Sequence, residues 1–130
     1  MAGYTVARRE DATDWMAQYE GFGEMRWYSA ALGTEQVSFS WRLMPPDTGG
    51  RGSYGHRHPG QEEVYLVVSG TVTFKVGGDV FEAGPKTAVR MTGEEYYSVH
   101  NDSDSDAELV LISTRLAEPK TEQQEGFWPQ

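Results

Sequence analysis

The sequence predicts an all-β domain, a sandwich or barrel built from short strands. Apolar and polar residues alternate over many short segments, and turn signals rich in glycine separate these segments at close spacing. Long helical periodicity and internal repeats are both missing from the sequence. A length of 130 residues suits one domain with a single core. We expect an N-terminal arm with a first strand over residues 1–35, a barrel over 36–115 and a C-terminal tail over 116–130.

The composition excludes several classes of partner. A formal net charge of -9 repels phosphate backbones, so we expect no nucleic-acid partner. No apolar run is long enough to span a bilayer, and the N-terminus lacks the apolar core of a signal peptide. We therefore expect no membrane contact and a cytoplasmic location. The absence of cysteine excludes disulfides and thiolate ligands.

The N-terminal segment mixes polar residues with large apolar ones. Residues 11–14 are predicted to cap a short helix from Trp15 to about Tyr19, which the glycines at 21 and 23 end. A first strand is predicted over residues 24–30. Three large apolar side chains argue against a wholly frayed arm: Trp15, Phe22 and Trp27.

The clearest strand runs over residues 36–43 and ends at two prolines, which cannot continue a ladder. Its apolar residues alternate with polar ones, which indicates a half-buried strand. We expect the apolar face to line the interior, with Phe39 and Trp41 either in the core or in the wall of a ligand pocket. Arg42 is then predicted to point outward, and so are Arg57 and Arg90, so that no anion site is assigned to them.

The remaining strands follow at short intervals, over residues 63–68, 71–76, 80–82, 87–91, 96–101 and 109–115. Residues 63–68 are apolar on both faces, which is typical of a strand buried on both sides. The tail is polar until Phe127 and Trp128. This aromatic pair is expected either to dock in a groove or to be disordered, and the sequence leaves both alternatives open.

Two histidines one residue apart mark the candidate site. In an extended chain the side chains of His56 and His58 share a face, because residues two apart point the same way. A turn at residues 59–61 then allows a carboxylate from the following strand to reach the same place. Two imidazoles with one carboxylate are a ligand set typical of reactive first-row metals.

These residues are also where the sequence resembles a known family. The cupin motif G-x5-H-x-H-x4-E-x6-G is matched at every position by Gly50, His56, His58, Glu63 and Gly70. The resemblance covers residues 36–115 and implies a single jelly-roll barrel. It further implies that His56, His58 and Glu63 bind a divalent transition metal (Fe, Mn, Ni or Zn, the identity being open), while Glu62 is a solvated neighbour.

The second cupin motif, G-x5-P-x-G-x2-H-x3-N, is only partly kept. Gly93 and Asn101 fit, but Tyr97 stands where the family's remaining metal-binding histidine is expected. Tyr97 has three interpretations: a phenolate ligand, a hydrogen-bond donor to metal-bound water or substrate, or a filler in an inactive site. Tyr96 is an alternative for the same role. His100 is another, although it should point outward because it lies on the face opposite Val99.

The resemblance implies a range of functions from which the fold alone does not choose. Our first hypothesis is a metal-dependent enzyme of the oxygenase or isomerase class that acts on a small polar organic molecule. Tyr97 would be its acid or hydrogen-bond donor, with Phe39, Trp41 and Tyr65 as the pocket wall. The alternative is a non-catalytic cupin that binds or senses a small molecule with a degenerate metal site. Pairing through sheet edges suggests a homodimer.

Overall fold

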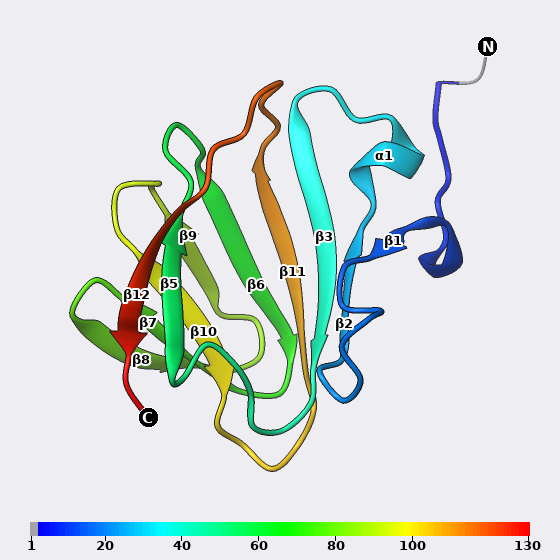
Figure 1. Cartoon of the computed structure of the whole chain (residues 1–130). Helices are drawn as coiled ribbons and strands as arrows, with labels where there is room; N and C mark the ends of the chain where they lie inside the picture. Colours follow the sequence, from blue (N-terminus) through cyan, green and yellow to red (C-terminus); the bar gives the residue numbers. More distant parts are fainter. Residues whose placement is uncertain (1–2) are drawn as a thin grey trace.

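Two β-sheets face each other in the computed structural model, which describes residues 3–130 (Figure 1). The first sheet has the strand order β1-β2-β3-β11-β6-β9, and the second has the order β12-β5-β10-β7-β8 with β4 paired to β10. Consecutive strands repeatedly lie in different sheets, which gives a jelly-roll whose sheets do not close into a continuous barrel. The predicted all-β jelly-roll fold is therefore confirmed.

The six strands predicted between residues 63 and 115 agree with the observed bounds to within two residues, whereas β12 lies in the tail, where no strand was predicted. The first sheet contains β1 (Thr13–Asp14), β2 (Glu24–Trp27), β3 (Val37–Met44), β11 (Ala107–Thr114), β6 (Glu63–Ser69) and β9 (Ala88–Met91). The second sheet contains β12 (Glu122–Trp128), β5 (Ser53–Arg57), β10 (Tyr97–Asn101), β7 (Val72–Val76), β8 (Asp79–Ala83) and β4 (Thr48–Gly49). A 3₁₀ turn (Arg9–Asp11) and one short helix, α1 (Ser29–Leu32), are the helical elements of the described chain.

The core fills the space between the sheets with side chains from both. Twelve buried residues form it: Met44, Tyr65, Val67, Val72, Phe74, Ala83, Met91, Tyr97, Val99, Ala107, Leu109 and Leu111. They alternate with outward residues along each strand, as the pleat requires. Tyr65, Tyr97 and Leu111 of this cluster also line a pocket, so the core and the pocket adjoin.

The orientation predicted for β3 is wrong. Ser38 and Ser40 point into the interior, where both line a pocket, whereas Phe39 and Trp41 lie on the outer face of the sheet. The outer aromatic side chains are half-buried by local partners: Phe39 packs against Tyr28, and Trp41 Nε1 donates to Glu108 Oε1. The prediction failed because it assumed an apolar interior along the whole strand, while this part of the interior encloses polar groups.

Because β3 is turned this way, the outward orientation predicted for Arg42 is also wrong. Arg42 shares the inner face with Ser40, and its strand partners are Met25 and the fully buried Leu109. Arg57 and Arg90 do lie outside, where they pair with Glu122 and Glu62.

Strand β6 is buried on one face only. Glu63, Tyr65 and Val67 point inward, whereas Val64, Leu66 and Val68 remain 37%, 39% and 46% exposed on the outer face. The expectation of a strand covered on both sides is therefore wrong for the described chain. Apolar residues on both faces of this strand reflect its high β propensity, which does not depend on both faces being covered.

The N-terminal arm contains no helix at the predicted place. Residues 15–22 form turns between β1 and β2, and the helix lies later, at α1. Helix α1 ends at Gly33, which adopts the left-handed conformation (φ 72°) that glycine accepts without strain. Strands β1 and β2 extend the first sheet beside β3, so that the arm is part of the fold.

The C-terminal aromatic pair is docked rather than disordered. Strand β12 pairs antiparallel with β5, and both Phe127 and Trp128 are buried. The ring of Phe127 lies so close to Gly55 that a Cβ atom there would be 2.5 Å from it. The absence of a side chain at Gly55 is thus what lets the last strand approach β5. Among residues 3–130 no helix is long and apolar enough to cross a bilayer.

The Phe127→Ala substitution tests whether the last strand belongs to the folded domain. It removes a buried ring (6% exposed), so we expect the free energy of unfolding to fall by about 3 kcal/mol in urea titrations. Glu125→Ala, on an exposed position of the same strand, is the control and should change it by less than about 0.5 kcal/mol. Equal effects of the two substitutions would contradict the docking of β12.

Candidate functional site

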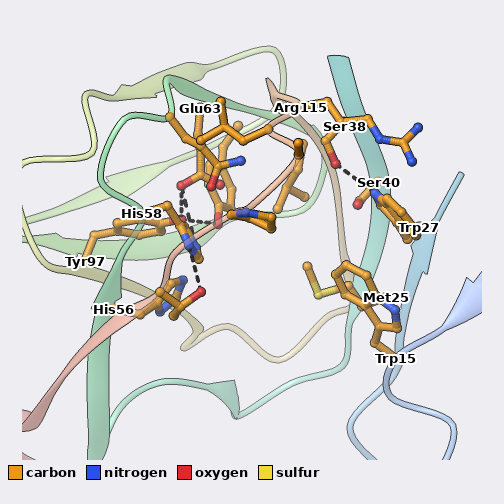
Figure 2. A pocket seen from close by; sticks show the side chains of 17 residues that line it. Trp15, Met25, Trp27, Ser38, Ser40, His56, His58, Glu63, Tyr97 and Arg115 are labelled. Carbon is orange, nitrogen blue, oxygen red and sulfur yellow. Dashed lines mark hydrogen bonds and ion pairs between the residues drawn. The ribbon is translucent and has the colours of Figure 1, made fainter. Parts of the chain in front are cut away.

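A pocket of about 510 Å³ lies between the two sheets and adjoins the core. This volume suits a small organic ligand. Figure 2 shows two walls: His56, His58, Glu63 and Tyr97 lie on one side, and Trp15, Met25, Trp27, Ser38 and Ser40 on the other. The first wall carries the titratable groups and the second carries most of the apolar surface.

The titratable wall is built where β5, β6 and β10 meet. Tyr97 begins β10 and is the strand partner of His56, which places their rings side by side with centroids 4.5 Å apart. His58 follows the end of β5, and its ring centroid lies 5.2 Å from that of His56. Glu63 begins β6, and its Oε1 atom is 4.0 Å from His58 Nε2. The three predicted metal ligands therefore border one pocket.

A chain of buried hydrogen bonds joins the two sheets at this wall. Tyr97 Oη donates to Glu63 Oε1 at 2.6 Å, and the hydroxyls of Tyr65 and Tyr97 are 3.0 Å apart. Since Tyr97 gives its own proton to Glu63, Tyr65 is the donor in the second bond. Burial raises the pKa of Tyr97 far above its usual range, and the neighbouring Tyr65 and Glu63 raise it further. In the absence of a metal ion, Tyr97 is thus a protonated donor to Glu63.

His56 is neutral in its folded environment. Burial, then the neighbouring His58 and then the charge of Arg42, lower the pKa of His56 to about 4. The orientation of His58 is fixed differently, because its Nδ1 lies 3.2 Å from both the carbonyl oxygen of Lys120 and Thr121 Oγ1. A carbonyl oxygen only accepts, so Nδ1 carries a proton and donates it, and Nε2 is the ring nitrogen on the side of Glu63.

The chemical types of the donor atoms fit a divalent metal, but the side chains are not close enough together to coordinate one ion as they stand. Two imidazoles and a carboxylate suit a first-row transition ion, and a neutral His56 is in the form that binds metal. Within residues 3–130, however, no three His, Cys, Asp or Glu side chains are arranged as a group that could hold an ion. Glu63 Oε1 is instead engaged by Tyr97. The site as described is hydrogen-bonded, with chemistry suited to a metal.

The apolar wall comes from residues that sequence reasoning did not assign to the site. Trp15 and Trp27 stack with ring centroids 5.6 Å apart, and Trp27 Nε1 donates to Ser38 Oγ at 2.8 Å. The guanidinium of Arg115 lies 5.3 Å from the ring centroid of Trp27. The sequence signal that could have identified this wall was the unusual number of large apolar residues in a polar N-terminal arm. It indicated that these residues are buried, but it did not show that they line a pocket.

The other predicted site residues are divided between the pocket and the outside. Tyr65 borders the pocket as expected, whereas Phe39 and Trp41 do not. Tyr96 lies beside Arg57, whose Cζ is 4.4 Å from its ring centroid. His100 points away from Val99 as predicted and is buried near Trp128, where its Nε2 is 3.0 Å from Asp47 Oδ1. Of the three residues considered for the second motif, Tyr97 is therefore the one that borders the pocket.

The lowered pKa of His56 predicts a loss of stability in mild acid for the protein freed of metal. Above pH 6.5 the imidazole is neutral in both the folded and unfolded states, so it contributes no pH dependence. As the pH falls from 6.5 towards 4, only the unfolded chain takes up the proton, and the free energy of unfolding should drop by roughly 3 kcal/mol. Urea titrations across this range measure the drop.

Carboxylates also titrate over part of this range, so the wild type is compared with His56→Gln. The variant should lack the portion of the pH dependence that His56 causes. Parallel curves for the two proteins would show that the imidazole is not held neutral in the folded state.

The Tyr97→Phe substitution tests the hydrogen bonds between the sheets. It leaves Glu63 and Tyr65 without their shared partner, so the free energy of unfolding should fall by about 1–3 kcal/mol. Tyr96→Phe is the matched control and should change it by less than about 0.5 kcal/mol. Chemical unfolding of both variants decides the point, and an unaffected Tyr97→Phe protein would show that this hydroxyl does not tie the sheets together.

Known structures with similar folds include proteins of different kinds. A sugar phosphate isomerase from a cupin superfamily of Silicibacter pomeroyi superimposes with a TM-score of 0.71 at 16% identity, covering 84% of this chain and 69% of the other. The polyketide cyclase RemF of Streptomyces resistomycificus gives 0.70 at 14% identity, with 94% and 84% covered. A cupin protein of Bacteroides fragilis gives 0.68 at 16% identity, with 91% and 89% covered.

A comparison with curated proteins gives no match. The sequence profile described as Cupin domain matches residues 42–113, which is more than half of the chain and includes His56, His58, Glu63 and Tyr97. The matched segment and the two-sheet fold agree with the motif at residues 50–70. This chain therefore belongs to the cupin domain family.

Proposed function

We propose that this chain is a metal-dependent cupin enzyme, of the oxygenase or isomerase class, which acts on a small polar organic molecule. One observation carries the proposal: two imidazoles, a carboxylate and a protonated phenol converge on one pocket of about 510 Å³. Titratable groups gathered in a cleft are typical of catalytic sites, and burial moves the pKa values of two of them, His56 and Tyr97.

His56, His58 and Glu63 are the residues that would hold the metal. A divalent ion such as Fe, Mn, Ni or Zn would supply Lewis acidity or redox chemistry. The chain's own contribution is to keep His56 neutral by burial and to fix the tautomer of His58 through the Lys120 carbonyl. Such outer contacts orient ligating histidines.

Tyr97 would supply a hydrogen bond or a proton to the substrate. Its raised pKa keeps the proton on Oη, where it is available for donation; without a ligand, Oη donates it to Glu63 at 2.6 Å. Tyr65 donates in turn to Tyr97. If Tyr97 gave up its proton, this hydrogen bond would stabilise the negative charge left on Oη. The stacked pair Trp15 and Trp27 would exclude water from the opposite side of the ligand.

The family and the fold support an enzyme or a binder without choosing the substrate. The names of two similar structures, a sugar phosphate isomerase and a polyketide cyclase, describe different chemistry on one fold. At 16% and 14% identity they support the fold alone, so their substrates are not transferred to this chain.

A non-catalytic binding or sensing cupin is the second candidate, and one observation favours it. Glu63 is already bonded to Tyr97, and the described residues hold no closed metal group. In that case the pocket would retain a small molecule without converting it. Tight retention of an unchanged ligand by the metal-loaded protein would support this second function.

The experiment that tests the proposal is metal analysis of protein purified without chelator. The wild type should carry close to one transition ion per chain, and Glu63→Gln should lose it because a carboxylate ligand is gone. Glu62→Gln is the matched control, since Glu62 lies outside the pocket with Arg90, and it should keep the metal. A metal-free wild type after incubation with Fe, Mn, Ni and Zn would contradict the metal site.

Turnover separates the enzyme from the binder. The metal-loaded protein is incubated with small hydroxy acids, sugars and phenols, and the products are followed by NMR together with oxygen consumption. Conversion that Tyr97→Phe reduces by about 10²-fold or more would support an enzyme with Tyr97 in the proton-transfer role. Conversion left unchanged by that substitution would exclude Tyr97 from the role.

We also propose that the protein forms a homodimer and works in the cytoplasm, without a nucleic-acid partner. The net charge of -9 supports the last of these. Light scattering of the purified protein measures the oligomeric state directly.

A further inference from the structure

The most unusual charge in the molecule is Arg42, which lies on the inner face of β3. Ser38, Ser40 and Arg42 follow one another on this face, and the first two border the pocket. Met25, the partner of Arg42 on β2, borders the pocket as well. Arg42 therefore lies one step beyond the pocket lining along the strand, towards the packed core.

Protein surrounds the guanidinium of Arg42, and burial lowers its pKa from the ordinary value. Part of the residue's surface nevertheless remains accessible. Its neighbours Ser40 and Met25 border the pocket, so the side chain lies directly behind the pocket lining. The pocket residues Tyr65 and Tyr97 act in the opposite direction on the pKa of Arg42, and the charge of Arg42 contributes to lowering the pKa of His56.

No carboxylate compensates this buried cation within residues 3–130. Its Nε is buried without a hydrogen-bond partner, and no ion pair or side-chain hydrogen bond engages its guanidinium in the described chain. The contrast with the surface is clear, because five other arginines each pair with a carboxylate: Arg9, Arg26, Arg51, Arg57 and Arg90. Glu63, the carboxylate of the pocket, is engaged by Tyr97.

An unpaired buried guanidinium is costly, since it has lost its water and gained no counter-charge. Such a group is stabilised most by an oxyanion, because its planar donors match a carboxylate or phosphate in a bidentate fork. A neutral ligand would leave the charge uncompensated. The position of Arg42 beside a pocket is thus explained if the missing counter-charge arrives with the ligand.

We propose that Arg42 binds an anionic group of the ligand, so that the pocket selects small carboxylates or phosphate esters over neutral molecules. The inference rests on the proposed function in that it specifies the ligand of the same pocket. It assigns Arg42 to recognition and leaves metal binding to His56, His58 and Glu63.

The first test is thermal unfolding of the metal-free protein with sodium acetate, inorganic phosphate, glycerol as the neutral probe, or sodium chloride at equal ionic strength. We expect acetate or phosphate to raise the unfolding temperature above the chloride and glycerol values. A larger shift with acetate would indicate a carboxylate ligand, and a larger shift with phosphate would indicate a phosphate ester. Shifts no larger than those of chloride would overturn the proposal.

Arg42→Met and Arg90→Met are the matched variants, since each removes one arginine charge. The first removes it from the inner face of β3, and the second removes it from the outer face of the first sheet. Arg42→Met should bind the effective anion at least about tenfold more weakly, whereas Arg90→Met should bind it like the wild type. Without anion, Arg42→Met should unfold at a higher temperature than the wild type, because the uncompensated charge is gone. Undiminished anion binding by Arg42→Met would overturn the proposal.

If Arg42→Met does not fold, the wild type still decides the question. The Nε–H NMR signal of Arg42 should shift on titration with the effective anion, and shifts confined to surface arginines would overturn the proposal. Metal content separates this inference from the proposed function. Arg42→Met should retain the metal of the wild type. A wild type that takes up no metal on incubation with Fe, Mn, Ni and Zn, yet binds anions through Arg42, would refute the metal site alone.

Discussion

The site depends on one buried contact between the two sheets, the hydrogen bond from Tyr97 on β10 to Glu63 on β6. A buried carboxylate requires a partner, and Tyr97 supplies it from the opposite sheet. Tyr65 extends the contact, so three side chains hold the two sheets at a fixed separation. That separation gives the pocket its shape and brings His56, the strand partner of Tyr97, to the same wall.

The interior is divided between a packed core and a pocket whose lining includes polar groups, and this division explains the orientation of β3. A strand that turned Phe39 and Trp41 inward would fill the space that the pocket occupies. With Ser38, Ser40 and Arg42 inside, the strand leaves room and brings hydrogen-bonding groups and a positive charge. Under the proposed function this charge would oppose a cation held by His56, His58 and Glu63, and the proposed anionic ligand would offset it.

The two ends of the chain complete the pocket, although the family match covers only residues 42–113. The N-terminal arm contributes Trp15 and Trp27 to the apolar wall. The segment before β12 holds His58 through Lys120 and Thr121, and β12 itself packs on β5. Segments outside the matched residues therefore contribute to the lining of this pocket and to the contacts that hold His58.

The sequence by itself determined the all-β class and most strand positions. It also determined that His56, His58 and Glu63 lie close to one another, because alternation and motif spacing are local properties of the chain. It also placed His100 on the face opposite Val99. Which face of β3 points inward was decided only by the tertiary structure, since alternation defines two faces without saying which one meets the other sheet. The burial of Arg42, the Tyr97–Glu63 bond and the tryptophan wall likewise join residues far apart in sequence, and no local pattern encodes such contacts.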